Sequence, residues 1–244
     1  MKTIFKTILI LTPLLLVGCA TKLPSFAHVH VGHALSAWPA TPKKQGLFTL
    51  AEELAVECTK ASIKASELAE QGRYDEAIAE SSKLVSLIGT ADSNHSDEKA
   101  HYSFISAFTH ASDHLRFSAE SNDATPNLTS GLTKIVSQTD EIISRAKVIH
   151  QLASALNSIN DKSTIDDAIQ QLRILTVQNL EGGDGHYSLK EMRNDLADTL
   201  AREDPPYTAP EKKYLFGVVR LPDGTWFWNF KNSESNKSYG RYTY

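Results

Sequence analysis

The sequence has few of the residues that would place it in a well-marked functional class. It has only two cysteines, Cys19 and Cys58, and it lacks the Cys-x-x-Cys-His motif that attaches haem covalently. It also has no block of like charge, and its formal net charge is −4. Because a surface that reads phosphates needs clustered lysine and arginine, these features argue against nucleic-acid binding.

Catalytic motifs are also missing. The chain has no nucleophile elbow, no phosphate-binding loop and no dinucleotide fingerprint. The adjacent residues Glu52 and Glu53 do not share a helix face, and His110 is not followed by the glutamate of the zinc-peptidase motif. The sequence leaves the question of an activity open but favours a non-enzymatic function.

Long apolar runs are absent except near the N-terminus. Residues 8–17 are apolar and follow the basic Lys2 and Lys6, which is the arrangement of a secretory signal peptide. The run is too short to cross a bilayer as a helix. It ends in Leu16-Val17-Gly18-Cys19, which resembles the lipobox of bacterial lipoproteins. This resemblance implies cleavage after residue 18 and acylation of Cys19 with lipid such as palmitate.

The lipobox also carries expectations about location. Ala20 follows Cys19, and in the lipoprotein sorting pattern that this resembles, alanine implies the outer membrane, on its periplasmic face. We therefore expect membrane attachment through the N-terminal lipid, and an envelope protein as the other candidate partner. Loss of residues 1–18 would change the formal net charge from −4 to −6. Cys58 would remain unpaired and, on the apolar stripe of its helix, is interpreted as a small buried hydrophobe.

The rest of the chain predicts a mostly α-helical protein. Apolar residues recur at three- and four-residue steps, and glycine or proline follows several of the segments. We expect helices over residues 46–71, 74–88, 97–121, 126–157, 163–180 and 189–202. This is a bundle of about five to six helices, and the 126–157 helix, roughly 45 Å long, would set its axis.

The predicted organisation has four parts. They are a signal peptide (1–18), a tether with a histidine-rich segment (19–45), the helical bundle (46–203) and a C-terminal appendage (204–244). The appendage is predicted to be a small β-hairpin with an aromatic tail, because segments 214–221 and 225–230 flank the turn sequence Pro222-Asp223-Gly224.

Histidines supply the main candidate site. His28, His30 and His33 lie close together in the tether segment. In an extended chain His28 and His30 would point the same way, and a turn would bring His33 round to them. Imidazole is a usual ligand of zinc, copper, nickel and iron. The alternative is an ordered segment that packs Val29 and Val31 onto the bundle.

A second pair, His110 and His114, has the i, i+4 spacing of helical metal sites. The pair lies opposite the main apolar stripe of its helix, in a second stripe with Ala107 and Phe117. A helix with two such faces is sandwiched between neighbours or binds a ligand. If the segment with His28 folds across this face, five histidines converge, whereas on a solvent face the pair is inert.

Two further histidines, His101 and His150, lie on predicted core stripes. A core histidine is usually a neutral packing residue. Two of them facing each other across a bundle would instead hold haem iron without a covalent link, as in four-helix cytochromes.

The turn before the last helix resembles an EF-hand calcium loop from its fifth position on. Asp184, Ser188 and Glu191 fall at loop positions five, nine and twelve. Positions one and three, which should supply oxygen ligands, are Leu180 and Gly182. We interpret the stretch as a degenerate loop that keeps its turn, and calcium binding is not expected.

Three stretches, 28–38, 113–147 and 181–191, resemble a group of small helical proteobacterial envelope proteins. In that group a histidine-rich segment ending in Gly-His-Ala precedes a helical bundle and an EF-hand-like loop. The resemblance supplies no activity. From the histidines we predict a binding protein for a transition metal or a metal-bearing cofactor. The alternative is a structural or protein-interaction lipoprotein with no metal, which docks a partner through Phe117 or Trp228.

Overall fold

The structure is a computed structural model that describes residues 25–89, 102–204 and 206–207, together with three short strands nearer the C-terminus. The described residues are mostly helical, which confirms the prediction of a mostly α-helical protein. The helices are α2 (Phe26–Leu35), α3 (Leu47–Glu70), α4 (Tyr74–Ile88), α5 (Phe104–Glu120), α6 (Pro126–Val136), α7 (Thr139–Ala155), the short 3-10 helix η2 (Leu156–Ser158), α8 (Lys162–Glu181) and α9 (Leu189–Ala201).

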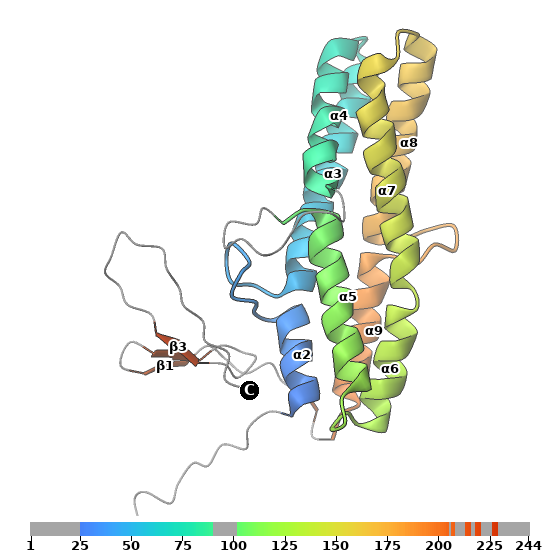
Figure 1. The fold of residues 1–244 in the computed structure, drawn as a ribbon. Helices are drawn as coiled ribbons and strands as arrows, with labels where there is room; N and C mark the ends of the chain where they lie inside the picture. Colours follow the sequence, from blue (N-terminus) through green and yellow to red (C-terminus); the bar gives the residue numbers. More distant parts are fainter. Residues whose placement is uncertain are drawn as a thin grey trace, which may run out of the picture.

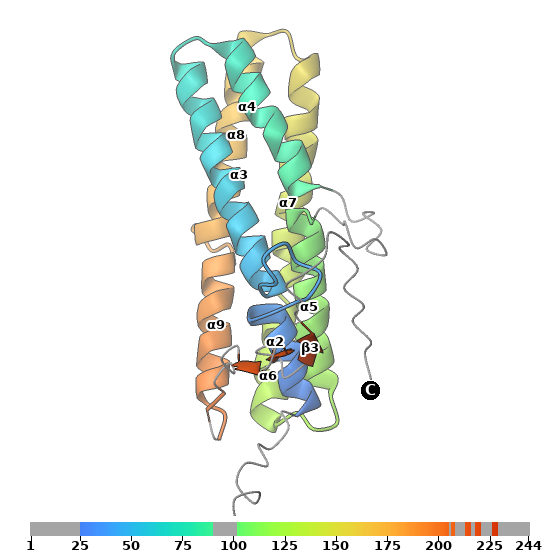
Figure 2. The same cartoon turned by 90° about the vertical axis from the view of Figure 1, so that its left-hand side faces the viewer.

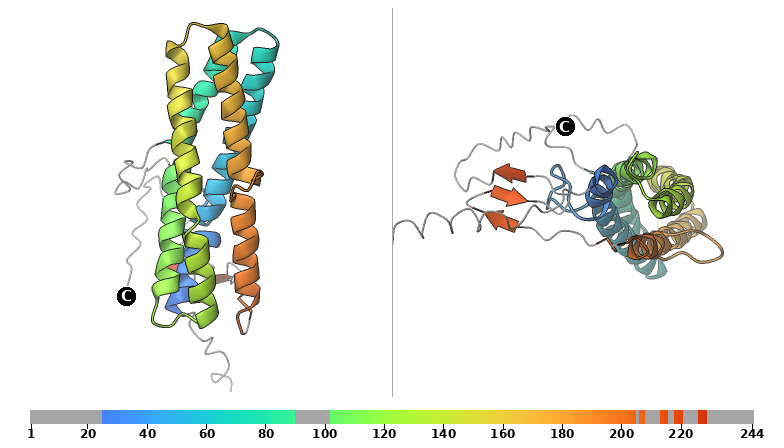
Figure 3. Two further views of the ribbon diagram at one scale, coloured as in Figure 1. Left: turned by 90° about the vertical axis from the view of Figure 1, so that its right-hand side faces the viewer. Right: turned by 90° about the horizontal axis from the view of Figure 1, so that it is seen from below.

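These helices form an elongated bundle with two halves, one following the other along its long axis (Figure 1, Figure 2). α3, α4, α7 and α8 pack around one half of the long axis, and α2, α5, α6 and α9 make up the other half. Helices that are consecutive in the chain, such as α6 and α7, can therefore lie one after the other along the long axis, each in a different half. The view along the axis in Figure 3 shows the helices arranged around a common interior.

Apolar side chains fill this interior along its length. The largest fully buried side chains include Phe48, Phe104 and Phe108, and the rings of Phe104 and Phe108 stack with centroids 5.6 Å apart. Cys58 is 2 % exposed, and burial raises the pKa of its thiol to about 12. The prediction that Cys58 is a buried hydrophobe is confirmed.

The prediction of a single helix over 126–157 is wrong in one respect, because the structure divides this segment into α6 and α7. Ser137 and Gln138 form a turn between them, in which the Gln138 N–H donates to the carbonyl of Ile135 at 3.1 Å. Ile135 and Ile142 are nevertheless both buried in the same hydrophobic core. The apolar spacing continues through the turn, and so periodicity alone predicted one helix.

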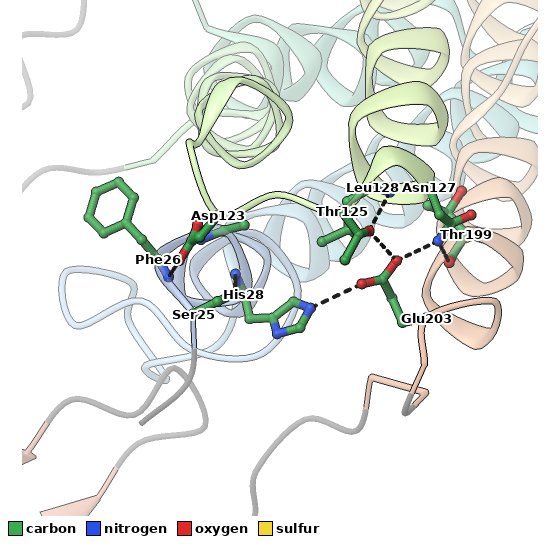
Figure 4. Close-up of polar contacts among 10 residues, drawn as sticks. Ser25, Phe26, His28, Asp123, Thr125, Asn127, Leu128, Thr199 and Glu203 are labelled. Carbon is green, nitrogen blue, oxygen red and sulfur yellow. Dashed lines mark hydrogen bonds and ion pairs between the residues drawn. The ribbon is translucent and has the colours of Figure 1, made fainter. Parts of the chain in front are cut away.

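The histidine-rich segment, predicted to be extended, contains the helix α2. The hydroxyl of Ser25 caps its first turn by accepting the N–H of His28 at 3.2 Å. The carboxylate of Asp123, from the turn between α5 and α6, accepts the N–H groups of Phe26 at 2.5 Å and Ala27 at 3.0 Å (Figure 4). Together these caps satisfy the exposed donors at the start of the helix.

Near the C-terminus lie three strands, β1 (Lys213–Leu215), β2 (Val218–Arg220) and β3 (Trp226–Trp228), paired antiparallel in that order. The turn of the predicted hairpin appendage, at 222–224, lies outside the described residues. The three-residue strands alone therefore do not support the appendage. The predicted signal peptide, Cys19 and His101 also lie outside them. Within the described residues, no helix is both long and apolar enough to cross a membrane.

Candidate metal centre

The centre is built where α2 lies along α5. The face of α5 that α2 covers is the second stripe of the sequence, and it contains the buried Ala107 together with His110 and His114. On α2, residues three apart share a face, whereas residues two apart are separated by about 200°. His30 and His33 therefore turn toward α5 together, and His28 turns away from them.

Three imidazoles meet at this contact. His30, His33 and His114 each offer one ring nitrogen, and the three atoms all lie within 4.8 Å of one another. The Nδ1 atoms of His30 and His114 are 2.9 Å apart and share a hydrogen bond. Since one ring must donate and the other accept, at least one of these imidazoles is neutral.

The spacing fits a metal ion with small side-chain movements. Zinc–nitrogen bonds are about 2.0–2.1 Å, so two nitrogens on a tetrahedral ion are roughly 3.3 Å apart. The contact between His30 and His114, at 2.9 Å, would open slightly, and the widest separation in the group would close by no more than about 1.5 Å. Imidazole rings rotate easily about their last torsion, and such rotation moves the ring nitrogens over distances of this order.

The surroundings of His114 and His30 favour the neutral form that binds metals. Burial lowers the pKa of His114 to about 3, and repulsion from His33, His30 and His110 adds to this effect. Burial and His33 also lower the pKa of His30, while Asp123 acts in the opposite direction. Neutral imidazoles offer a lone pair to a metal, and at neutral pH His30 and His114 are therefore ready to coordinate.

The side chain of Trp38 covers the side of the centre that faces the core. The ring of Trp38 lies with its centroid 4.8 Å from both His33 and His114. Its indole N–H donates to the hydroxyl of Tyr102 at 3.1 Å, and its half-buried ring packs against the core. This side of the group is therefore occupied by protein.

The opposite side is open and apolar. The ring centroids of Phe26 and Phe117 lie 4.5 Å and 5.5 Å from that of His30. These two side chains are 49 % and 44 % exposed. With Glu120 and Asp123 they border a shallow depression at the surface. Access to the centre from solvent is therefore on the side of the two phenylalanines.

His28 is not part of the group. Its Nε2 lies 3.4 Å from a carboxylate oxygen of Glu203, whose side chain is 2 % exposed. Glu203 also accepts hydrogen bonds from Thr125 at 2.7 Å and Asn127 at 2.6 Å (Figure 4). Burial would raise the pKa of Glu203, but the hydrogen bonds from Asn127, Thr125 and His28 outweigh it and lower the pKa. This network joins α2 to the start of α6 and the residues after α9.

His110 lies one turn before His114 on α5, outside the group of three. Its ring is 6.4 Å from that of Tyr102, and its charge acts on His114 through space. Of the five histidines that would converge if the segment folded across α5, the structure brings together three. His150 is half-buried on α7, and its proposed haem partner lies outside the described residues.

The EF-hand-like stretch has another local role. The Ser188 hydroxyl accepts the N–H of Glu191 at 3.2 Å, and the Glu191 carboxylate accepts the N–H of Ser188 at 2.9 Å. This is the capping box that starts α9. Asp184 lies exposed in the turn with a φ of 54°. Ser188 and Glu191, which resemble the end of a calcium loop, thus also form the capping box at the N-terminus of α9.

Sequence reasoning missed three residues of the centre and its support: Trp38, Asp123 and Glu203. A tryptophan shortly after a histidine-rich stretch is a signal that could have drawn attention to Trp38. No local pattern links Asp123 or Glu203 to α2, because they contact it from 96 or more positions further along the chain.

Comparison of the chain with protein-family models, with curated proteins and with solved structures gave no match in any of the three.

Proposed function

We propose that the protein binds a transition-metal ion through His30, His33 and His114. The observation that carries this proposal is the convergence of three ring nitrogens, from two helices, within 4.8 Å of one another. The ligand set contains imidazole alone, without thiolate or carboxylate. Such a set suits zinc, copper, nickel or iron rather than calcium or magnesium.

A packing role alone explains these residues poorly. Each imidazole brings two polar nitrogens into a partly dry environment, where their desolvation is unfavourable. Apolar side chains on α2 and α5 would fill the same space without that penalty. A metal ion compensates for the desolvation by bonding directly to the nitrogens.

Haem fits the centre less well than a bare ion. Haem iron takes its axial ligands from opposite faces of the macrocycle. His30, His33 and His114 instead place their nitrogens in one tight group, and Trp38 occupies its inner side. The sequence prediction included a metal-bearing cofactor, and this arrangement supports haem less well than a bare metal ion.

The envelope setting of the proposal rests on the N-terminal sequence. If Cys19 is acylated in the outer membrane, Phe26 follows it by seven residues. Seven residues span at most about 25 Å when fully extended, so the metal centre would lie near the periplasmic membrane surface. Mass spectrometry of the N-terminal peptide, compared with a Cys19→Ser variant, tests this part separately.

Metal binding is tested on protein prepared from membranes without chelator. Elemental mass spectrometry should find about one equivalent of a transition metal, and titration of stripped protein with zinc should restore it. His114→Ala should weaken binding by about 100-fold or more, because only two ligands remain.

The matched control is His186→Ala. His186 is an exposed histidine beside Glu141 in the turn between α8 and α9, and its removal should leave the affinity unchanged. Equal zinc binding by the His114 variant and the unaltered protein would refute the proposal, as would a stripped protein that takes up neither zinc nor copper.

A second candidate is an interaction lipoprotein without metal, and the exposure of Phe26 and Phe117 favours it. Because α2 covers most of the second stripe of α5, the docking surface would be confined to these rings. This function predicts an empty centre and loss of a partner on Phe117→Ala.

A further inference from the structure

The candidate ligands of the metal come from two adjacent helices. His30 and His33 come from α2 and His114 from α5, and no further histidine, cysteine or carboxylate joins them among the described residues. Zinc and related ions usually complete a fourth position. The described part of the chain therefore supplies three ligands and leaves one position to another molecule.

The surroundings fix the direction of that position. Trp38 fills the inner side, with its ring 4.8 Å from His33 and His114. On the outer side the ring of Phe117 contacts both His30, at 5.5 Å, and His114, at 6.1 Å. A ligand that reaches the ion from solvent would therefore pass beside Phe117.

One carboxylate at the border of the depression already has hydrogen-bond partners. Asp123 accepts the N–H groups of Phe26 and Ala27 and the hydroxyl of Ser121, the last at 2.6 Å. Turning it toward the ion would uncap α2 and lose these hydrogen bonds. It remains instead a negative charge at the border of the depression, together with Glu120.

We propose that the bound metal keeps one exchangeable coordination position, open between Phe26 and Phe117, which takes a neutral nitrogen donor carried on an apolar body. The inference rests on the proposed metal site. The two phenyl rings would cover the body of the ligand, while Glu120 and Asp123 disfavour a small anion. A substituted imidazole has the required chemistry, and 4-phenylimidazole serves as the probe.

The experiment uses the full protein loaded with cobalt(II), whose visible spectrum reports its ligands. Imidazole, 4-phenylimidazole and azide are titrated separately, and the cobalt that remains on the protein is measured after each titration. Both nitrogen donors should shift the absorption bands without removing cobalt. Partial burial of the phenyl ring should make 4-phenylimidazole bind about tenfold more tightly than imidazole, and azide should bind most weakly.

Two variants separate the apolar contact from the metal itself. Phe117→Ala should abolish the advantage of 4-phenylimidazole and leave the affinity for imidazole little changed, and Phe26→Ala should reduce the same advantage. Ile174→Ala removes an equally exposed apolar side chain on α8 and should change neither affinity.

Each other outcome has a defined meaning. Cobalt that binds but shows no spectral response to any probe overturns the exchangeable position and leaves the proposed metal binding intact. Azide that binds more tightly than 4-phenylimidazole overturns the ligand class. Failure to take up cobalt, zinc or copper overturns the proposed function and this inference with it.

Discussion

The metal-free protein should lose stability in mild acid because of His114. In the unfolded chain a histidine has a pKa near 6.5, whereas burial and the neighbouring histidines lower the pKa of His114 in the folded protein to about 3. Between these two values the unfolded state binds a proton that the folded state does not. Stability is therefore complete above about pH 6.5 and falls as the pH is lowered toward 3.

The size of the effect follows from the same values. One pH unit corresponds to about 1.36 kcal/mol for a single group. At pH 5, about 1.5 units below the unfolded pKa, His114 alone should remove about 2 kcal/mol of the free energy of unfolding. The lowered pKa of His30 acts in the same direction. A loss of this size is a large fraction of the stability of an ordinary domain.

Urea denaturation of metal-free protein at pH 7.5 and pH 5.0 measures this loss. Asp123, Glu141 and Glu203 also have lowered pKa values, so the unaltered protein alone cannot assign the effect. The comparison is His114→Phe, which keeps a ring against Trp38 and Phe117 but does not titrate. The variant should lose about 2 kcal/mol less between the two pH values. Equal losses in both proteins would refute the assignment of a depressed pKa to His114.

Three other substitutions or treatments test the packing of the helical bundle. Glu203→Ala removes the buried acceptor of Thr125 and Asn127 and should lower the free energy of unfolding by about 2–3 kcal/mol in thermal or urea melts. Gly131→Ala would place a methyl group 2.5 Å from side-chain atoms of Thr199, so it should destabilise the α6–α9 contact by about 1–2 kcal/mol despite better helix propensity. Cys58, with its raised pKa, should react with a thiol reagent only in denaturant, and rapid labelling of the folded protein would contradict its burial.

The helices that pack in the bundle were largely predictable from the sequence. α3 and α4 have apolar residues at helical spacing and end at Gly72 and Gly89, both of which have positive φ, a conformation that glycine adopts most easily. The turn between α6 and α7 was not predictable in this way, since it leaves the apolar spacing unchanged. Periodicity reports which side of a segment is buried, and it does not report a local break on that same side.

The candidate site was predictable in its residue types and not in its geometry. The alternation of valine and histidine over residues 28–33 has the period of a strand, and it pointed to an extended chain. The caps that make the segment helical come from Ser25 and from the distant Asp123. The pairing of His30 with His114, 84 positions apart, likewise depends on tertiary packing, and one sequence contains no record of such a contact.

The helical form of α2 also changes what its histidines do. The two-residue spacing that would have made His28 and His30 a chelating pair in a strand instead sends them to opposite sides of the helix. His28 reaches Glu203, the start of the helix is held by Asp123, and His30 is left facing His114.

α2 is therefore docked by contacts that do not require a metal, and a metal would find its ligands already assembled. Since little ordering would accompany binding, most of the coordination energy would appear as affinity. At a free metal concentration 100 times the dissociation constant, binding would add about 2.7 kcal/mol to the stability of the folded state.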